Sequence, residues 1–199
     1  MSHYFETPDT IKSRHLVSAE IWGRRFDLLS SSGVFSGRRI DPGTAVLLRL
    51  AGPPDRSSGR FLDLGCGYGP IALALAAQCP GAVVDAVDTN EQALQLTAEN
   101  AGRLGLAGRV RALRPGEADP TTRYDEIWSN PPIRIGKAAL HDLMQTWLGR
   151  LADTGRATLV MGRHLGADSF QAWLREAGFA VTRIGSSQGF RVLRATRLP

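Results

Sequence analysis

The chain has 199 residues, 43% of them hydrophobic, which fits one globular domain or a core domain with a short appendage. It has no apolar run as long as a membrane span and no basic-then-apolar export pattern at its N-terminus, so we expect a cytoplasmic protein. Two cysteines are too few for a disulfide framework, and four scattered histidines lack ligand spacing, so we expect free thiols and no metal.

The net charge of +5 is unevenly distributed along the chain. Residues 61–100 contain five acidic side chains and no basic one, whereas residues 101–199 contain fifteen basic and eight acidic ones. The acidic stretch would suit a positively charged ligand, and the basic remainder would suit a polyanion. All basic residues but Lys12 and Lys137 are arginines, whose planar fork suits phosphate. A coding bias toward arginine with an ordinary solvated surface is the alternative.

Residues 1–58 are too few for a separate enzyme domain and are interpreted as an N-terminal extension. Within them, residues 22–29 resemble a short strand, residues 30–33 a turn, and residues 41–50 a helix. We expect the extension to lie over the open end of a sheet, with Gly33-Val34-Phe35-Ser36 as a loop near the crevice. Residues 59–199 then form the main domain.

Apolar runs and helical patterns alternate throughout this main domain. The last two predicted strands are joined by a short glycine-containing turn. The pattern predicts an α/β fold with a doubly wound, seven-stranded, mainly parallel sheet that carries one antiparallel strand. The predicted strands are 61–64, 82–87, 110–113, 124–128, 156–161, 179–184 and 190–196, and the predicted helices are 70–78, 91–104, 137–151 and 167–177.

A glycine-rich turn, Asp63-Leu64-Gly65-Cys66-Gly67-Tyr68-Gly69, follows the first of these strands and opens a helix. Its three glycines let the main chain pass close to a nucleoside cofactor. Pro70 stands where dinucleotide folds prefer a third glycine, and no Lys-Ser or Lys-Thr pair follows, which excludes a triphosphate-cradling loop. Asp88 closes the second strand, where a carboxylate can accept both ribose hydroxyls. A merely structural turn is the alternative.

A second motif, Asn130-Pro131-Pro132-Ile133, follows the strand predicted at 124–128. Two prolines after an amide form a rigid bend without competing N–H groups, and the bend presents the Asn130 side-chain oxygen and the Pro131 main-chain oxygen toward one point. Such a bend can hold an amine. If the glycine turn holds S-adenosylmethionine, the amine becomes a methyl acceptor and the chain is an N-methyltransferase. A loop that only terminates a strand is the alternative.

Together these motifs resemble the Rossmann-like class I S-adenosylmethionine-dependent methyltransferases. Within them, the chain is most similar to the single-domain form of the small-subunit (16S) ribosomal RNA guanine-N2 methyltransferase family. The family's longer members carry an additional N-terminal domain, which we do not expect here. The resemblance runs through His3-Tyr4-Phe5, Gly33-Val34-Phe35-Ser36, Asp41-Pro42-Gly43-Thr44, the glycine turn and the stretch from Ser129 to Lys137.

The resemblance implies a role for each matching residue. The catalytic residues would be Asn130, Pro131 and Pro132. The cofactor S-adenosylmethionine would be bound by Asp63, Gly65, Cys66, Gly67, Tyr68, Gly69, Asp88, Thr89, Asn90 and Glu117. Asp63 is expected at its amino-acid end and Glu117 at its adenine end, where Asp119 is a second acidic candidate. The substrate-binding residues would be Phe35, Ser36, Ile133, Arg134 and Lys137.

The resemblance also implies ribosomal RNA or the small ribosomal subunit as the partner. A target base in paired RNA would have to be flipped out of its stack. Many methyltransferases with the Asn-Pro-Pro motif place an aromatic residue after the prolines, whereas this chain has Ile133, so stacking would fall to another ring such as Phe35 or be replaced by apolar contact.

Two other classes of function remain open. One is methylation of another acceptor, such as a release-factor glutamine amide, adenine in nucleic acid or a small molecule. Enzymes of the first kind normally add a helical N-terminal domain and a tyrosine after the prolines, and adenine enzymes a separate recognition domain. The other is an RNA-binding relative without turnover, against which the intact Asp63, Asp88 and Asn130 argue.

Overall fold

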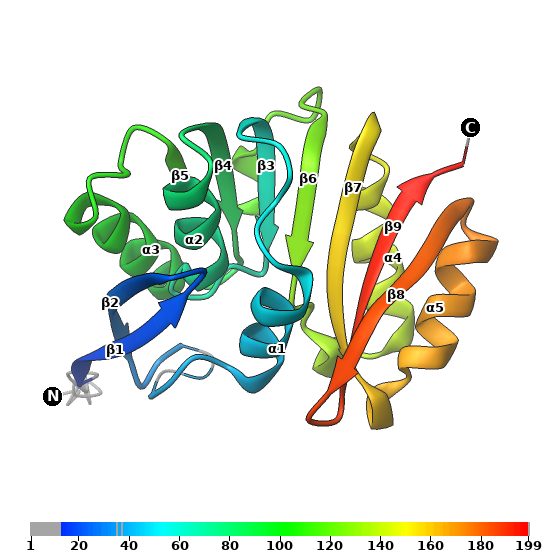
Figure 1. Cartoon of the computed structure of the whole chain (residues 1–199), viewed down its shortest axis with the longest axis horizontal. Helices are drawn as coiled ribbons and strands as arrows, with labels where there is room; N and C mark the ends of the chain where they lie inside the picture. The colour runs from blue at the N-terminus through cyan, green and yellow to red at the C-terminus, as the bar shows by residue number, and fades with distance from the viewer. Residues whose placement is uncertain (1–12, 35, 37, 199) are drawn as a thin grey trace, which may run out of the picture.

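The structure, a computed structural model, describes residues 13–34, 36 and 38–198, and its centre is a seven-stranded sheet (Figure 1). The strands lie in the order β5-β4-β3-β6-β7-β9-β8, in which β9 runs antiparallel to both of its neighbours and the other pairs are parallel. The α/β fold predicted from the sequence is therefore confirmed. The strands are β3 (Ser58–Leu64), β4 (Gly81–Val87), β5 (Val110–Leu113), β6 (Tyr124–Ser129), β7 (Leu151–Gly162), β8 (Phe179–Ser187) and β9 (Phe190–Arg197).

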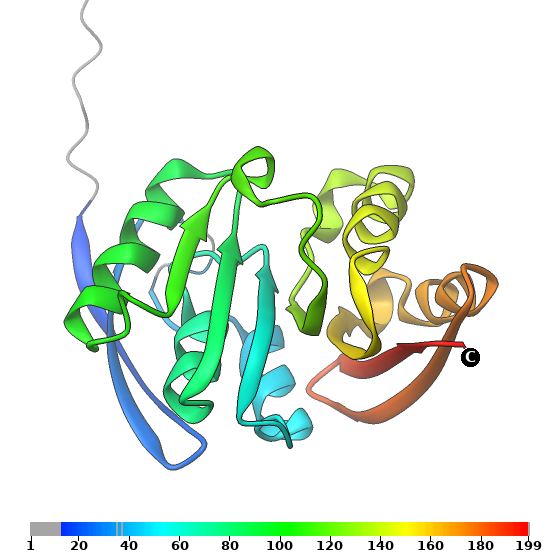
Figure 2. The same cartoon turned by 90° about the horizontal axis from the view of Figure 1, so that it is seen from above.

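Helices cover both faces of this sheet, as Figures 1 and 2 show. Because side chains alternate along each strand, Phe61 and Val84 join a core under α1, α2 and α3, whereas Leu62 and Leu159 join a second core under α4 and α5. The helices are α1 (Pro42–Ala51), α2 (Pro70–Gln78), α3 (Glu91–Arg103), α4 (Lys137–Leu148) and α5 (Ala167–Glu176), with short 3-10 turns η1 (Pro115–Glu117), η2 (Ile133–Ile135) and η3 (Arg163–Leu165).

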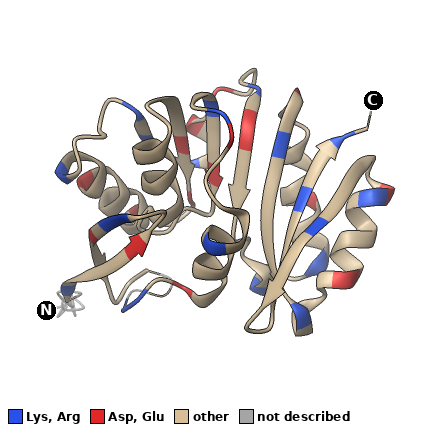
Figure 3. Ribbon diagram, in the orientation of Figure 1, with Lys and Arg blue, Asp and Glu red and all other residues tan. Residues whose placement is uncertain are grey.

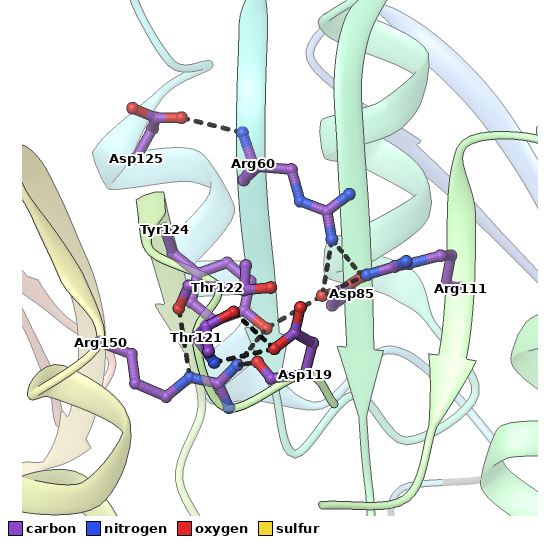
Figure 4. A network of polar contacts seen from close by, with 9 residues as sticks. All are labelled: Arg60, Asp85, Arg111, Asp119, Thr121, Thr122, Tyr124, Asp125 and Arg150. Carbon is purple, nitrogen blue, oxygen red and sulfur yellow. Dashed lines mark hydrogen bonds and ion pairs between the residues drawn. The ribbon is translucent and has the colours of Figure 1, made fainter. Parts of the chain in front are cut away.

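The connection between β5 and β6 contains only η1, and a polar cluster lies beside it (Figure 4). At its centre, fully buried Asp85 accepts hydrogen bonds from Arg111 Nε at 2.7 Å, Arg60 Nη2 at 3.1 Å and the Tyr124 hydroxyl at 2.9 Å. A buried carboxylate destabilises a fold unless it is paired. These contacts explain how a buried carboxylate is accommodated within β4, and they give Asp85 a structural role.

The N-terminal part of the described chain forms an antiparallel hairpin of β1 (Arg14–Ile21) and β2 (Arg24–Ser31). The turn residues Trp22 and Gly23 both have positive φ, 51° and 74°, which is typical of tight two-residue hairpin turns. The prediction of a strand over 22–29 was therefore wrong at its start. The prediction also missed β1, because the exposed Leu16 breaks the alternation of polar and apolar residues along that strand.

One buried side chain ties this hairpin to the glycine turn. Asn100 of α3 donates to the Leu29 carbonyl at 2.9 Å and to the Tyr68 carbonyl at 3.0 Å, and its oxygen accepts the Leu29 N–H at 2.7 Å. At the other end of the hairpin, Trp22 Nε1 donates to the Leu48 carbonyl of α1 at 2.9 Å. The hairpin is therefore anchored to α1 and, through Asn100 of α3, to the glycine turn.

The helix predicted over 137–151 was wrong at its C-terminal end, because α4 stops at Leu148 and Leu151 begins β7. Leu151 continues the helical apolar spacing, but in the fold it is buried opposite Tyr124 of β6. The close approach depends on Gly155, where a Cβ would lie 2.7 Å from the Tyr124 carbonyl oxygen. Strand pairing thus outweighs local helical periodicity here. The other predicted helices and strands are confirmed, with ends shifted by a few residues.

Candidate functional site

The glycine turn lies where the carboxyl end of β3 meets the carboxyl end of β4. The N–H groups of Gly65 and Cys66 both donate to the Val87 carbonyl, at 2.8 and 3.1 Å, which fixes the turn on the neighbouring strand. A Cβ at Gly67 would meet no atom within 4 Å, so the main chain there borders open space. The φ angles of Gly65, Gly67 and Gly69 are 77°, 56° and 95°, a region that favours glycine.

Asp63 lies under this turn and is completely buried. Its Oδ2 accepts the Ala72 N–H of α2 at 2.9 Å, whereas its Oδ1 has no hydrogen-bond partner within the described chain. Burial, together with the nearby Asp88 charge, raises the pKa of Asp63 to about 7, against the lowering effect of the Ala72 N–H. A buried acceptor without a donor is costly and invites a cationic or N–H-bearing ligand.

Asp88 follows β4 and is held on both of its carboxylate oxygens. Oδ2 accepts the Gly67 N–H at 2.9 Å, and Oδ1 accepts the Asn90 N–H at 2.9 Å. Asn90 in turn caps α3 by accepting the Gln92 N–H at 3.0 Å, while the neighbouring Thr89 is exposed. The Asp88 carboxylate is therefore fixed beside the open space at Gly67, with lone pairs to spare for a ligand.

Asn130 follows β6 with its side-chain amide fixed by α1. Its Nδ2 donates to Asp41 Oδ1 at 2.7 Å and to Thr44 Oγ1 at 3.1 Å, which occupies both amide hydrogens. Its Oδ1 accepts no hydrogen bond from the residues that the structure describes. This network defines the amide orientation, because the Asp41 carboxylate can only accept when ionised. Asn130 therefore presents an unused acceptor of defined direction.

The two prolines make the bend that the sequence predicts. Pro132 has φ −76° and ψ 73°, the geometry of an inverse γ-turn, and the Pro131 carbonyl accepts the Ile133 N–H at 2.9 Å. One lone pair of the Pro131 oxygen is therefore already used, and one remains. The bend runs beside the glycine turn, since a Cβ at Gly65 would lie 3.8 Å from the Asn130 main-chain oxygen.

One cavity joins the two motifs to the start of α1. Asp41 and Thr44, for which the sequence predicts only the start of a helix, thus belong to the site. The Asp-Pro-Gly-Thr stretch of the family resemblance was the signal that could have identified them. The cavity is lined by Ser36, Asp41, Thr44, Gly65, Cys66, Gly67, Tyr68, Pro70, Ile71 and Asn130.

Two buried side chains of the turn have distinct chemistry. The Tyr68 hydroxyl is buried without a partner among the described residues, and burial together with the nearby Asp41 charge raises its pKa, so the phenol stays protonated. The Cys66 thiol packs 3.8 Å from Thr97 Oγ1, and burial raises its pKa well above the usual range. A thiol of this kind is a poor nucleophile, so the Cys66 side chain is not suited to a reactive role.

The remaining residues predicted for the site lie at its margin or elsewhere. Glu117 is exposed, and its carboxylate accepts the Arg114 N–H at 2.7 Å, which caps η1. Ile133 is half-buried in η2, and Arg134 and Lys137 are exposed; these three do not line the cavity. Ser36 does line it, whereas Phe35 lies outside the described residues.

Within the described residues, no group of three or more His, Cys, Asp and Glu side chains is placed to hold a metal ion. The helices of the same ranges are too short or too polar to cross a membrane.

Comparisons with known proteins identify the family of this chain. A family model described as the methyltransferase small domain matches residues 25–194. The chain is 30% identical over 200 residues to the uncharacterized protein YbxB of Bacillus subtilis (strain 168), across 98% of each chain. It is 34% identical over 185 residues to ribosomal RNA small subunit methyltransferase C of Acinetobacter baumannii (strain AYE), across 89% of this chain and 53% of that protein.

Among solved structures, the chain matches the 16S rRNA N2 methyltransferase RsmC of T. thermophilus, in complex with AdoMet and guanosine. The TM-score is 0.83 at 26% identity, over 97% of this chain and 53% of that chain. The chain thus spans about half the length of the methyltransferase C relatives it matches.

The site residues fit the cofactor of this fold. S-adenosylmethionine combines a nucleoside with a sulfonium and an ammonium group, and the site offers open space at Gly67, a fixed carboxylate at Asp88 and an unpartnered buried oxygen on Asp63. No basic residue occurs between residues 61 and 100 to repel the positive charges. The chain belongs to the methyltransferase small domain family and is an S-adenosylmethionine-dependent methyltransferase.

Proposed function

We propose that this protein methylates the exocyclic N2 amine of a guanine in small-subunit ribosomal RNA, in the cytoplasm. The observation that carries the proposal is the fixed Asn130 amide, which leaves its Oδ1 as an acceptor beside the glycine turn. An exocyclic amine carries two N–H donors, so it requires acceptors such as this oxygen. The names of the ribosomal RNA relatives and of RsmC support this acceptor.

The cofactor would be held by the main chain of the glycine turn and by two acids. Asp88 would accept the ribose hydroxyls, and the free Asp63 oxygen would face the amino-acid end. When bound, S-adenosylmethionine supplies an electrophilic methyl group and leaves as a neutral thioether. The other residues proposed for this half of the site are Gly65, Cys66, Gly67, Tyr68, Gly69, Thr89, Asn90 and Glu117.

The chain's own part in catalysis is to prepare the amine. The lone pair of a guanine N2 is conjugated with the ring and is a poor nucleophile. Asn130 Oδ1 and the remaining lone pair of the Pro131 oxygen would accept the two N–H hydrogens, favour a tetrahedral nitrogen and direct its lone pair at the methyl carbon. Pro132 holds the bend. Methyl transfer would form an N–C bond to the guanine while the C–S bond to the leaving thioether breaks.

The proton balance needs no strong base. The nitrogen becomes acidic only as it is methylated, and its extra proton then passes to water or to the Asn130 oxygen. Since Asn130 Nδ2 donates to Asp41 and Thr44, the amide cannot rotate to offer its N–H groups to the amine without breaking both hydrogen bonds.

The substrate side of the site would be formed by the loop with Phe35 and Ser36 and by Ile133, Arg134 and Lys137. We propose that residues 1–58 act as an extension over the active-site end of the domain formed by residues 59–199. Two contacts support this role for the described part: α1 supplies Asp41 and Thr44 to the site, and the β1–β2 hairpin is bonded to Tyr68 through Asn100.

One experiment tests the acceptor directly. Radiolabelled methyl transfer is measured in parallel on free small-subunit RNA, intact small subunits, release factor and DNA, followed by nucleoside analysis of the labelled RNA. We expect label only in RNA, as N2-methylguanosine. Label in adenosine, in DNA or in the release factor would replace the proposed acceptor. If the protein binds the cofactor but transfers methyl to none of the four substrates, the remaining alternatives are a small-molecule acceptor and an RNA-binding protein without turnover.

A further inference from the structure

A second pocket, separate from the catalytic cavity, lies where β8 and β9 meet the start of η3. It has a volume of about 480 Å³, and half of the residues around it are arginines. The mechanism above uses none of them. The pocket is lined by Arg163, Arg183, Ile184, Gly185, Ser186 and Arg191.

A bulge in β8 brings the polar side chains onto one face of the sheet. Arg183 pairs with Leu193 and Ser186 pairs with Arg191, with a register shift between Arg183 and Gly185. In a regular strand, residues three apart point to opposite faces, but one extra residue reverses the alternation. Arg183 and Ser186 therefore both share the face of Arg191, which is the face covered by α5.

The arginines outnumber the acids around this pocket. Arg191 is only 7% exposed, its guanidinium is bonded to Asp168 of α5, and its Nε–H has no partner among the described residues. The hydrogen bond to Arg191, with the charges of Arg191, Arg163 and Arg183, lowers the pKa of Asp168. Three guanidinium groups thus share one carboxylate, which leaves the pocket with net positive charge and donors to spare.

The pocket opens at the same edge of the sheet as Asn130. Figure 3 shows Lys and Arg spread over the half of the sheet that contains β7, β8 and β9, including its lower end. Arg191 pairs with Met161 of β7, two residues beyond Leu159, the partner of Ser129 of β6. With strands spaced about 4.8 Å apart and residues about 3.3 Å apart, Arg191 lies about 10 Å across the sheet and about 7 Å along the strands from Ser129, the last residue of β6. A short stretch of single-stranded RNA spans that distance.

We propose that the pocket formed by Arg163, Arg183, Ser186 and Arg191 binds a backbone phosphate of the RNA substrate, close to the target nucleotide. The inference rests on the proposed function for its ligand, a phosphodiester of RNA. Arginine forks bind phosphate oxygens in pairs, and a phosphate held here fixes the strand's register relative to Asn130 without reading a base.

The test uses the full chain with Arg163→Gln and Arg183→Gln together, because both side chains are exposed and Arg191 is buried. Affinity for a single-stranded small-subunit RNA fragment is measured against salt concentration. We expect about ten-fold weaker binding and a salt slope shallower by about 1.4, from two lost contacts at about 0.7 each. Cofactor affinity stays unchanged. Arg163→Lys with Arg183→Lys keeps the slope and loses only part of the affinity.

The matched control is Arg103→Gln with Arg175→Gln, which removes the same two charges from exposed positions at the C-terminal turns of α3 and α5. If the control variant weakens RNA binding equally, the loss is explained by the change in net charge, and the proposed phosphate site is overturned. If the wild type methylates RNA and the pocket variant binds RNA as tightly as the wild type does, the phosphate site is overturned. The proposed function then still stands.

A wild type that neither binds nor methylates RNA would overturn the proposed function together with the RNA phosphate site. Titration with inorganic phosphate, followed by the arginine Nε–H resonances, then tells whether the pocket still takes an anion. Shifts confined to the pocket arginines would identify a site for a free phosphate or a small phosphorylated ligand in place of RNA.

Discussion

Asp41, the N-cap of α1, accepts the Gly43 and Thr44 N–H groups and the Asn130 side-chain amide on the same carboxylate oxygen, at 2.8, 3.1 and 2.7 Å. One side chain thus starts a helix and orients the proposed amine acceptor 89 residues away in the chain. Helix capping and site geometry are therefore coupled in this fold.

Replacing Asn130 should abolish transfer and spare the cofactor. In Asn130→Ala, we expect methyl transfer to fall by at least about two orders of magnitude, as the loss of a transition-state contact does, with S-adenosylmethionine affinity within a few-fold. Single-turnover rates and calorimetry measure the two quantities. Equal losses of rate and affinity would make Asn130 a cofactor ligand.

Asp41 should matter for both stability and rate. Asp41→Ala should lower the free energy of unfolding by about 1 kcal/mol, the usual loss for an N-cap, and lower the transfer rate because the Asn130 amide is released. Asp41→Ser can restore the cap without restoring a charged acceptor for Asn130. We expect it to recover denaturant stability but not rate. Parallel recovery of both would show that Asp41 acts only as a helix cap.

Asp88 should govern cofactor affinity. Asp88→Ala should weaken S-adenosylmethionine binding by about 1.5 to 3 kcal/mol, the range for a charged acceptor, since the ribose hydroxyls lose their partner and the Gly67 N–H loses its anchor. Calorimetry on this variant, with Glu99→Ala on the surface of α3 as the control, measures the loss. Unchanged affinity would place the ribose elsewhere.

The buried Asp63 predicts a pH dependence of stability. Burial raises its folded pKa to about 7, above the ordinary value of about 3.9 in an unfolded chain. The folded state therefore binds the proton more tightly than the unfolded state. The resulting contribution of Asp63 to the free energy of unfolding is complete below about pH 4 and is lost as pH rises through about 7. Urea denaturation of wild type and Asp63→Asn from pH 5 to pH 8 measures it. We expect the wild type to lose stability relative to the variant over that range, and parallel curves would contradict the raised pKa.

Arg134 and Lys137 should serve RNA and not the cofactor. Arg134→Glu with Lys137→Glu should weaken RNA binding and methylation together and flatten the salt dependence of RNA binding, with cofactor affinity intact. Because Lys137 is the first residue of α4, a glutamate there is favourable for the helix dipole, so lost stability would not explain the effect. Unchanged RNA affinity and salt slope would place the RNA path elsewhere.

Much of this protein follows from local patterns in its sequence. The alternation of apolar strands and amphipathic helices determined the α/β class, because periods of 2.0 and 3.6 residues are set by the backbone. The glycine turn and the proline bend could be predicted for the same reason, since each glycine frees φ and each proline restricts φ at its own position. The positions of Asp63, Asp88 and Asn130 at strand ends followed from these assignments.

Tertiary structure decided what depends on pairing between distant segments. The start of β7 at Leu151 needed Tyr124 as its partner, and the hairpin turn at Trp22 needed the register of β1 with β2. The bond from Asn130 to Asp41 is not visible in either motif alone. The bulge that gathers Arg183 and Arg191 is hidden as well, because one extra residue in a strand changes which face a side chain occupies without changing local composition.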